Sequence, residues 1–348
     1  MVRKTKIASS KKGIDMCGIF GMFGQNNFEA VNNGLSKIKH RGPDATGIKE
    51  HEGVLHGHVR LSIMDVESRS DQPFCYEDGV LSYNGELWNY ITLREELTGG
   101  GYSFRTTGDT EVVAAALHMW GVEALLRMDG MFAFAWSSPR EQILSVDHFG
   151  KIPLYISRKG KTFTWSSEIK GFSSTQIRAN LLPPGTFLDL SSGKITPFYK
   201  IREVAHKSLL RRLREKNKNG VENTKSLLLS GVKKRLMSDV PLCLLCSGGL
   251  DSSLILHMSK QFKQDIVAYT AVFDENSKDL KNARYVCEEA SVELREVFIG
   301  DIDDKKVEDA VYSIESGMKT QVEISLLCLP LAKKISEDDL YEIPKIKH

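Results

Sequence analysis

The cysteine at position 17 has the surroundings of a nucleophile. Cys17 opens the segment Cys-Gly-Ile-Phe-Gly-Met-Phe-Gly and follows Met16. At a mature N-terminus, one cysteine carries a thiol that attacks carbonyl carbon and an α-amine, of reference pKa about 8, that moves the proton. The sequence as written places residues 1–16 before this cysteine. We therefore expect these residues to be a propeptide or sequence upstream of the true start, and Cys17 to act once they are removed.

A second stretch with chemical meaning covers Ser238–Ser253 and reads Ser-Asp-Val-Pro-Leu-Cys-Leu-Leu-Cys-Ser-Gly-Gly-Leu-Asp-Ser-Ser. An apolar strand ends here, glycines and serines make a turn, and a helix begins. Backbone N–H groups in such a turn bind anions, and the helix N-terminus adds positive potential. Gly248 and Gly249 let phosphate oxygens approach the backbone closely. No lysine precedes the serines, so this is not the P-loop pattern, and the plain alternative is a turn without a ligand.

Four short motifs follow Cys17 along the first half of the chain. They are His-Arg-Gly-Pro-Asp (40–44), Val-Arg-Leu-Ser-Ile-Met-Asp (59–65), Tyr-Asn-Gly-Glu (83–86) and Thr-Gly-Asp-Thr-Glu (107–111). Through them the chain from Cys17 to about Lys200 resembles the class II glutamine amidotransferases, which use an N-terminal nucleophile. The resemblance rests on all five segments in this order, since each one alone is common.

The chemistry of glutamine suits the residue types in these motifs. Arg60 offers a guanidinium for the α-carboxylate, which it can grip bidentately, and Asp109 offers a carboxylate for the α-ammonium. Attack on the side-chain amide builds an oxyanion, and the resemblance implies that the Asn84 amide and the Gly85 N–H stabilise it. One such donor is worth about 2.7–4 kcal/mol of barrier. The glutamine-binding residues implied by the resemblance are Arg60, Leu61, Ile63, Asn84, Gly85, Glu86 and Asp109.

Each of these residues also has a plainer explanation when it is taken alone. Arg60 would be a surface arginine on a strand, and Asp109 would be the N-cap of a helix. Asn84 and Gly85 form the commonest hairpin-turn dipeptide. Cys17 would be a small buried hydrophobic residue. The joint order of the motifs favours the glutamine site over these alternatives.

The loop at 247–253 resembles the Ser-Gly-Gly-x-Asp-Ser loop of N-type ATP pyrophosphatases, which split ATP into AMP and pyrophosphate. The resemblance implies that Asp251 lies near the magnesium–pyrophosphate as a metal ligand. It also implies that Val272, at the end of the next strand, lies beside the adenine nucleotide. The ATP-binding residues implied are Cys246, Ser247, Gly248, Gly249, Asp251, Ser252, Ser253 and Val272.

An amidotransferase followed by this loop is the arrangement of the glutamine-dependent asparagine synthetases, which use ATP and Mg²⁺. The resemblance implies that aspartate attacks ATP to give β-aspartyl-AMP, that ammonia from glutamine displaces AMP, and that the protein forms a homodimer. The segment Glu315–Leu327 departs from the family pattern, which leaves open an amide ligase with another acceptor. The chain also ends before a further loop of that family, which leaves open a glutaminase alone or an inactive truncated product.

The elements that must position these residues change in kind near residue 200. Paired strands with few helices predict an α+β domain of antiparallel sheets over 17–200. Alternating helices and strands predict an incomplete α/β domain with a parallel sheet over 221–348, after a basic linker at 201–220. The expected strands are 54–66, 79–83, 131–137, 142–146, 154–157, 162–165, 241–246, 266–273 and 294–299. The expected helices are 28–39, 87–97, 110–118, 227–237, 252–262, 278–290, 305–315 and 322–335.

Composition narrows the class of protein. The 348 residues are 41% hydrophobic and 26% charged, which is typical of a globular chain. The net charge of +2 gives no reason to expect nucleic acid or an anionic membrane as a partner, and no apolar run approaches the roughly 20 residues of a membrane span. Cys243 and Cys246 lie in an apolar run, which predicts buried strand cysteines rather than a metal or redox site. We therefore expect a cytoplasmic enzyme.

Overall fold

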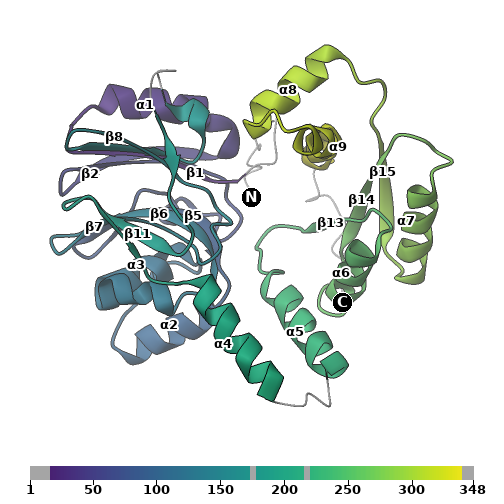
Figure 1. Cartoon of the computed structure of the whole chain (residues 1–348), viewed down its shortest axis with the longest axis horizontal. Coiled ribbons are helices and arrows are strands. Elements are labelled where there is room, and N and C mark those ends of the chain that lie inside the picture. Colours follow the sequence, from purple (N-terminus) through teal and green to yellow (C-terminus); the bar gives the residue numbers. More distant parts are fainter. Residues whose placement is uncertain (1–15, 173–177, 215–219, 339–348) are drawn as a thin grey trace, which may run out of the picture. The chain divides into compact units, whose positions relative to one another are not determined.

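The computed structural model describes residues 16–172, 178–214 and 220–338. The chain forms two compact units, one holding the elements from β1 to α4 and the other those from α5 to α9 (Figure 1). The boundary between them follows residue 218. The expected propeptide covers residues 1–16, of which 1–15 lie outside the described residues.

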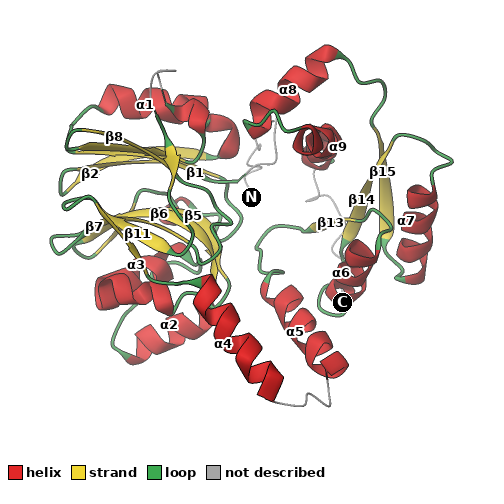
Figure 2. Ribbon diagram, in the orientation of Figure 1, coloured by secondary structure: helices red, strands yellow, loops and turns green. Residues whose placement is uncertain are grey.

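Two six-stranded antiparallel sheets make up most of the first unit (Figure 2). One sheet has the order β10-β8-β9-β1-β3-β2, and the other has the order β12-β11-β7-β6-β5-β4. The strands of the first sheet are β1 (Gly18–Phe23), β2 (Ala45–His51), β3 (Val54–Arg60), β8 (Tyr155–Lys159), β9 (Thr162–Ser166) and β10 (Asn180–Leu181). Those of the second are β4 (Phe74–Tyr76), β5 (Gly79–Leu87), β6 (Gly130–Ser137), β7 (Gln142–Val146), β11 (Thr186–Asp189) and β12 (Lys194–Pro197). The expected α+β class with antiparallel sheets is confirmed.

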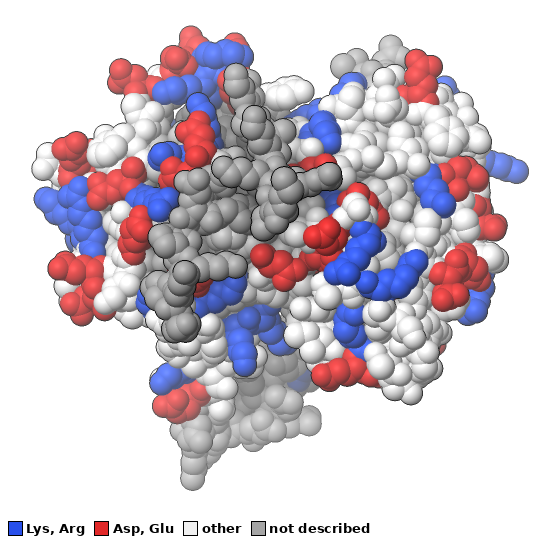
Figure 3. Space-filling view, turned by 180° about the vertical axis from the view of Figure 1, so that it is seen from behind, with Lys and Arg blue, Asp and Glu red and all other residues white. Residues whose placement is uncertain are grey.

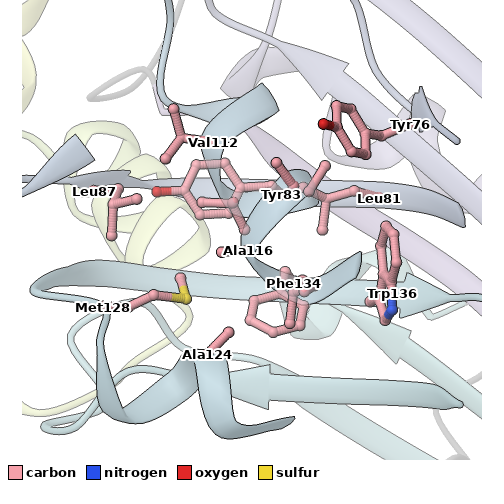
Figure 4. Close-up of a cluster of buried hydrophobic side chains, with 14 of the residues drawn as sticks. Tyr76, Leu81, Tyr83, Leu87, Val112, Ala116, Ala124, Met128, Phe134 and Trp136 are labelled. Atoms are coloured by element: carbon pink, nitrogen blue, oxygen red, sulfur yellow. The ribbon is translucent and has the colours of Figure 1, made fainter. Parts of the chain in front are cut away.

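Helices cover the outer faces of the two sheets. Helix α1 (Phe28–Lys37) covers the first sheet, and α2 (Tyr90–Gly99) and α3 (Thr110–Trp120) cover the second (Figure 1). Helix α3 is apolar on all sides from Val112 to Leu117, and each of these residues is buried. Its side chains pack with Tyr83, Phe134 and other residues of the second sheet to form the larger core (Figure 4). The first unit therefore places a rigid packed layer directly behind strand β5.

Several expected boundaries in this unit differ by one or two residues, and three near strands β3 and β5 are wrong by three residues or more. The strand expected over 54–66 ends at Arg60, because the chain leaves the sheet in a bend and Asp65 adopts a left-handed conformation with φ 42°. The strand expected to stop at Tyr83 continues to Leu87, paired with β6 throughout. The helix expected from Leu87 therefore begins only at Tyr90.

The second unit contains a three-stranded parallel sheet of order β13-β14-β15, as the alternating pattern predicts. The strands are β13 (Cys243–Leu245), β14 (Val267–Val272) and β15 (Glu293–Phe298). One face of the sheet packs against α6 (Leu250–Lys260) and α7 (Lys278–Glu289), and the other against α9 (Lys319–Glu337). The remaining helices are α5 (Gly220–Lys234) and α8 (Asp304–Ile314).

The stretch expected as a linker contains a helix, α4 (Ile201–Arg214), whose first residues are exposed. Lysine, arginine, aspartate and glutamate side chains lie interspersed on the face drawn in Figure 3, in keeping with the small net charge. Within the described ranges, no helix combines the length and the apolar composition needed to cross a bilayer.

Candidate functional site

Cys17 lies immediately before strand β1, at the end of the sheet where strand β3 also ends. Its side chain is half-buried, and its Sγ accepts a hydrogen bond from the backbone N–H of Leu61 at 3.3 Å. The guanidinium Nε of Arg41 donates to the Cys17 carbonyl oxygen at 3.0 Å. The nucleophile predicted from the sequence is therefore fixed on both its side chain and its backbone.

The charges around Cys17 come from segments far apart in the sequence. Burial raises the pKa of the Cys17 thiol, while the Leu61 N–H and the charges of Arg60 and Arg41 lower it, and the Asp109 carboxylate raises it further. The structure thus brings Arg60 and Asp109 to the cysteine, as the glutamine-site prediction requires. Because the net shift is upward, the thiol stays protonated at neutral pH, so attack needs a neighbouring base.

Arg60 is 4% exposed, so the alternative of a surface arginine is wrong. One terminal nitrogen donates to the Glu67 carbonyl at 2.9 Å and to the Asp71 carboxylate at 2.6 Å. The other donates to the Asp65 carbonyl at 2.5 Å and, at 3.4 Å, to that of Met64. The terminal N–H groups are therefore engaged, and a substrate carboxylate that bonds to them must displace an acceptor such as Asp71, whose side chain is 43% exposed.

Asp109 is the N-cap residue of α3, yet its side chain caps nothing. Its carboxylate instead accepts hydrogen bonds from the Leu87 N–H at 2.9 Å and the Tyr83 hydroxyl at 3.2 Å. Burial raises the pKa of Asp109 to about 6, although these two hydrogen bonds oppose the shift. No lysine, arginine or histidine of the described residues pairs with this carboxylate. Burial of an ionised carboxylate without a neighbouring cation costs free energy. Carboxylates in such surroundings are typical of sites that bind a ligand.

Asn84 and Gly85 lie within strand β5 rather than in a turn, so the turn alternative is wrong. They pair with Ala133 and Phe132 of β6. A Cβ at Gly85 would stand 2.3 Å from the Met131 carbonyl oxygen, so only glycine fits there. Asn84 is 1% exposed, and its Nδ2 has no hydrogen-bond partner among the described residues. A buried amide donor without a partner typically costs about 1–3 kcal/mol, which structures tolerate chiefly at functional sites.

The other residues predicted to contact glutamine occupy the same region. Leu61 and Ile63 follow strand β3, and both are half-buried. Glu86 continues strand β5 opposite Met131. No sequence motif indicated Tyr83 as the partner of Asp109, because only the fold brings its hydroxyl to that carboxylate.

The second candidate site lies at the carboxyl edge of the parallel sheet. Strand β13 ends at Leu245, and α6 begins at Leu250 with Gly249 as an N-cap that makes no side-chain capping bond. The first N–H groups of α6 are thus not used by a cap, as an anion site requires. Gly248 has φ 73°, and a Cβ there would lie 2.6 Å from backbone atoms of both Asp279 and Ala283 in α7.

The serines of this loop are tied to its backbone. The Ser247 and Ser252 hydroxyls lie 3.1 Å apart, and the Ser253 hydroxyl donates to the Gly249 carbonyl at 2.7 Å. Cys246 is buried beneath the loop, as predicted for a strand cysteine, whereas Cys243 is half-buried. Val272 ends strand β14 at the same edge of the sheet.

Asp251 is exposed in the first turn of α6. No group of three or more His, Cys, Asp or Glu side chains in the described parts of the chain could hold a metal ion by itself. One carboxylate beside a turn with uncapped N–H groups nevertheless has the donor type that Mg²⁺ uses, since this ion usually binds one or two carboxylates together with substrate phosphates.

Two stacked antiparallel sheets with a cysteine before a central strand define the class of N-terminal-nucleophile amidotransferases. The family model described as glutamine amidotransferase domain matches residues 16–216, and the model described as asparagine synthase matches residues 223–339. The chain belongs to the glutamine amidotransferase family, as its five motifs predict.

Several curated relatives align with most of this chain. This chain is 31% identical over 293 residues to asparagine synthetase [glutamine-hydrolyzing] 1 of Bacillus subtilis, covering 75% of this chain and 46% of that protein. It is 32% identical over 346 residues to asparagine synthetase B [glutamine-hydrolyzing] of Escherichia coli, covering 92% of this chain and 61% of that protein. The chain thus spans about half to three fifths of the length of these relatives. Among solved structures, glutamine phosphoribosylpyrophosphate amidotransferase of B. subtilis aligns with 84% of this chain and 70% of its own, at 18% identity and a TM-score of 0.46.

Proposed function

We propose that this protein is a glutamine-dependent amide ligase of the asparagine synthetase type. The observation that carries the proposal is a cysteine thiol within the electrostatic reach of both the Arg60 guanidinium and the buried carboxylate of Asp109, which has no cation partner among the described residues. An α-amino acid with a carboxylate and an ammonium complements this pair of charges. Of the common amino acids, glutamine and asparagine carry a side-chain primary amide that yields ammonia when it is cleaved, and the match to the glutamine amidotransferase domain favours glutamine.

In the proposed first reaction, residues 1–16 are removed and the freed α-amine of Cys17 takes the thiol proton. The Sγ attacks the side-chain carbonyl carbon of glutamine, and the resulting oxyanion accepts hydrogen bonds from Asn84 and the Gly85 N–H. The C–N bond breaks as the amine returns the proton to nitrogen, which leaves as ammonia. Water then cleaves the thioester to glutamate and restores the thiol.

In the proposed second reaction, ATP binds with its phosphates on the turn of Ser247–Ser253 and its adenosine beside Val272. An oxygen of the aspartate side-chain carboxylate attacks the α-phosphorus, and pyrophosphate leaves. Ammonia attacks the acyl carbon of the resulting β-aspartyl-AMP, AMP departs with that oxygen, and a proton passes to solvent, giving asparagine. Mg²⁺ held by Asp251 and the phosphates would supply positive charge to the departing pyrophosphate.

Glutamate release from glutamine tests the first reaction. The protein beginning at Cys17, with its N-terminus checked by intact mass, is compared with its Cys17→Ala variant. Cys75→Ala is the matched control, because Cys75 is an exposed cysteine on β4. We expect the control to retain activity and Cys17→Ala to lose it; equal rates in both variants would refute the nucleophile. The 348-residue chain itself should release no glutamate until residues 1–16 are removed.

AMP formation from ATP and Mg²⁺ tests the second reaction. We expect AMP to form only when aspartate is added, and asparagine to form when glutamine is present as well. A screen of other carboxylic acids tests the alternative acceptor suggested by the Glu315–Leu327 segment. AMP formed with another acid and not with aspartate would replace the acceptor while leaving the glutamine reaction intact.

A further inference from the structure

Glu168 is a buried carboxylate with three basic neighbours, and no motif of the sequence pointed to it. It follows strand β9, and its residue is 8% exposed. Its oxygens lie 2.7 Å from an Arg41 terminal nitrogen, 3.0 Å from His40 Nε2 and 3.2 Å from Lys170 Nζ. Burial opposes ionisation, but the hydrogen bonds from His40 and Arg41 and the charge of Arg41 prevail and lower the pKa of Glu168 to about 2. The carboxylate is therefore ionised throughout the range in which an enzyme works.

This carboxylate connects to the nucleophile through a single side chain. Arg41 donates from one terminal nitrogen to Glu168 and from Nε to the Cys17 carbonyl oxygen at 3.0 Å. The Arg41 side chain is only 14% exposed, so its orientation depends on these two contacts. Because the guanidinium is planar, the position of the Glu168 carboxylate helps to set where Arg41 contacts the backbone of Cys17.

Ser167, the residue before Glu168, is hydrogen-bonded to strand β1, which follows Cys17. The Ser167 hydroxyl accepts from the Ile19 N–H at 2.9 Å, and the Ser167 N–H donates to the Ile19 carbonyl at 2.9 Å. The segment 167–168 therefore fixes the chain at Cys17 and again two residues later. Such double anchoring leaves little freedom at the residue whose thiol must meet a carbonyl carbon.

Glu168 also balances charge around the cysteine. The charged groups that act on Cys17 from the neighbouring elements are Arg41, on the turn 39–41, Arg60, at the end of β3, and Asp109, before α3. His40 and Lys170 add two basic groups around Glu168. Without the Glu168 carboxylate, the charge of Arg41, whose Nε contacts the Cys17 carbonyl oxygen, would lose its buried partner and would disfavour a protonated α-amine.

We propose that Glu168 is a positioning residue for the amidotransferase reaction, which orients Arg41 on the Cys17 carbonyl and keeps the freed α-amine basic enough to accept the thiol proton. This inference rests on the proposed function of Cys17. It assigns two separable contributions to one carboxylate. One is geometric and depends on its reach, and the other is electrostatic and depends on its charge.

Two substitutions separate these contributions in the glutamate-release assay. Glu168→Gln keeps the size of the side chain and removes the charge; Glu168→Asp keeps the charge and shortens the reach by one methylene. We expect KM to be nearly unchanged in both variants, and kcat to fall on the order of a hundredfold in Glu168→Asp, because a misplaced nucleophile loses rate rather than binding. The acid limb of the kcat profile should move to lower pH by about half a unit or more in Glu168→Gln and stay in place in Glu168→Asp.

Wild-type activity is measured first, and its absence would refute the function of Cys17 rather than the role of Glu168. Glu96→Gln is the matched control, because it removes an exposed glutamate that is paired with Arg127. All rates are normalised to folded protein by thermal unfolding. A wild-type kcat in both Glu168 variants overturns the proposal. A fall in kcat with no movement of the acid limb in Glu168→Gln overturns its electrostatic part, and a loss that follows only the folded fraction reduces Glu168 to a structural residue.

Discussion

The affinity for glutamine should depend on pH through a single carboxylate, Asp109. Burial raises the pKa of this group to about 6, so it is mostly protonated at pH 5 and mostly ionised at pH 8. Only the ionised form attracts the α-ammonium of glutamine. Because protonation of the free site competes with binding, affinity should rise as the pH increases through about 6 and then level off.

The magnitude follows from the fraction of ionised carboxylate. With a pKa of about 6, roughly one tenth of Asp109 is ionised at pH 5, so the apparent dissociation constant there should be about tenfold larger than at pH 8. This corresponds to about 1.4 kcal/mol of binding free energy. The carboxyl and ammonium groups of glutamine do not titrate in this range, so they add no slope of their own.

Calorimetric titration of Cys17→Ala with glutamine, from pH 5 to pH 8, measures this dependence without turnover. Asp109→Asn is the control: it retains acceptors for the Leu87 N–H and the Tyr83 hydroxyl but carries no charge. We expect weak binding at every pH in the control and no slope. An affinity that is constant over this range in Cys17→Ala, or an identical slope in the Asp109→Asn background, would contradict the assignment of Asp109 to the ammonium.

Three further outcomes follow from the contacts. In the chain that begins at Cys17, Asn84→Ala should lower kcat by about 10²–10³. Its thermal midpoint should stay unchanged or rise, because Nδ2 has no partner to lose. An unchanged kcat in the glutamate-release assay would exclude Asn84 from the oxyanion site. As the pH rises from about 4 to about 6, Asp109→Asn should gain up to about 3 kcal/mol of unfolding free energy relative to wild type, because a raised pKa makes ionisation oppose folding. Urea unfolding measures this difference, and a difference independent of pH would refute the raised pKa. Gly248→Ala should weaken ATP binding and lower the melting temperature of the second unit, because its Cβ would lie 2.6 Å from backbone atoms of α7. Gly249→Ala should retain stability, because its Cβ would meet only the Ser247 hydroxyl, at 3.4 Å.

Sequence patterns predicted the classes of both units but not the edges of their elements. Alternating apolar residues and short polar turns indicated the antiparallel sheets, and the alternation of helix and strand indicated the parallel one. Short strands such as β4 and β10 were missed, since two or three residues carry no period, and the longer strands β1 and β2 were missed as well. The helix expected at Leu87 failed because strand pairing with β6 prevails over local helix preference until Tyr90.

For the candidate site as well, the sequence predicted the residues but not the contacts between them. Motifs indicated Cys17, Arg60 and Asp109, which share one region of the fold. They could not indicate Tyr83 as the partner of Asp109, or Glu168 as the partner of Arg41, because those contacts join residues 26 and 127 positions apart. They also missed that Asp71 already occupies the Arg60 guanidinium, since only the bend after β3 brings the two together. Spacing along a chain identifies residue types, whereas pairing across elements needs the fold.

The residues for which local rules failed are those assigned to glutamine chemistry. An Asn-Gly pair lies within a strand, an N-cap aspartate caps nothing, and an arginine on a strand is buried. The first two placements leave a cost that the rest of the unit must offset: an amide without an acceptor and a carboxylate without a cation. Packing of the apolar segment of α3 behind β5 supplies stabilisation at the same place, with six consecutive buried residues from Val112 to Leu117. If a ligand with an ammonium and a carbonyl group relieves both costs, its binding should stabilise the unit beyond what its contact area predicts, and this gain should vanish in the Asp109→Asn, Asn84→Ala double variant.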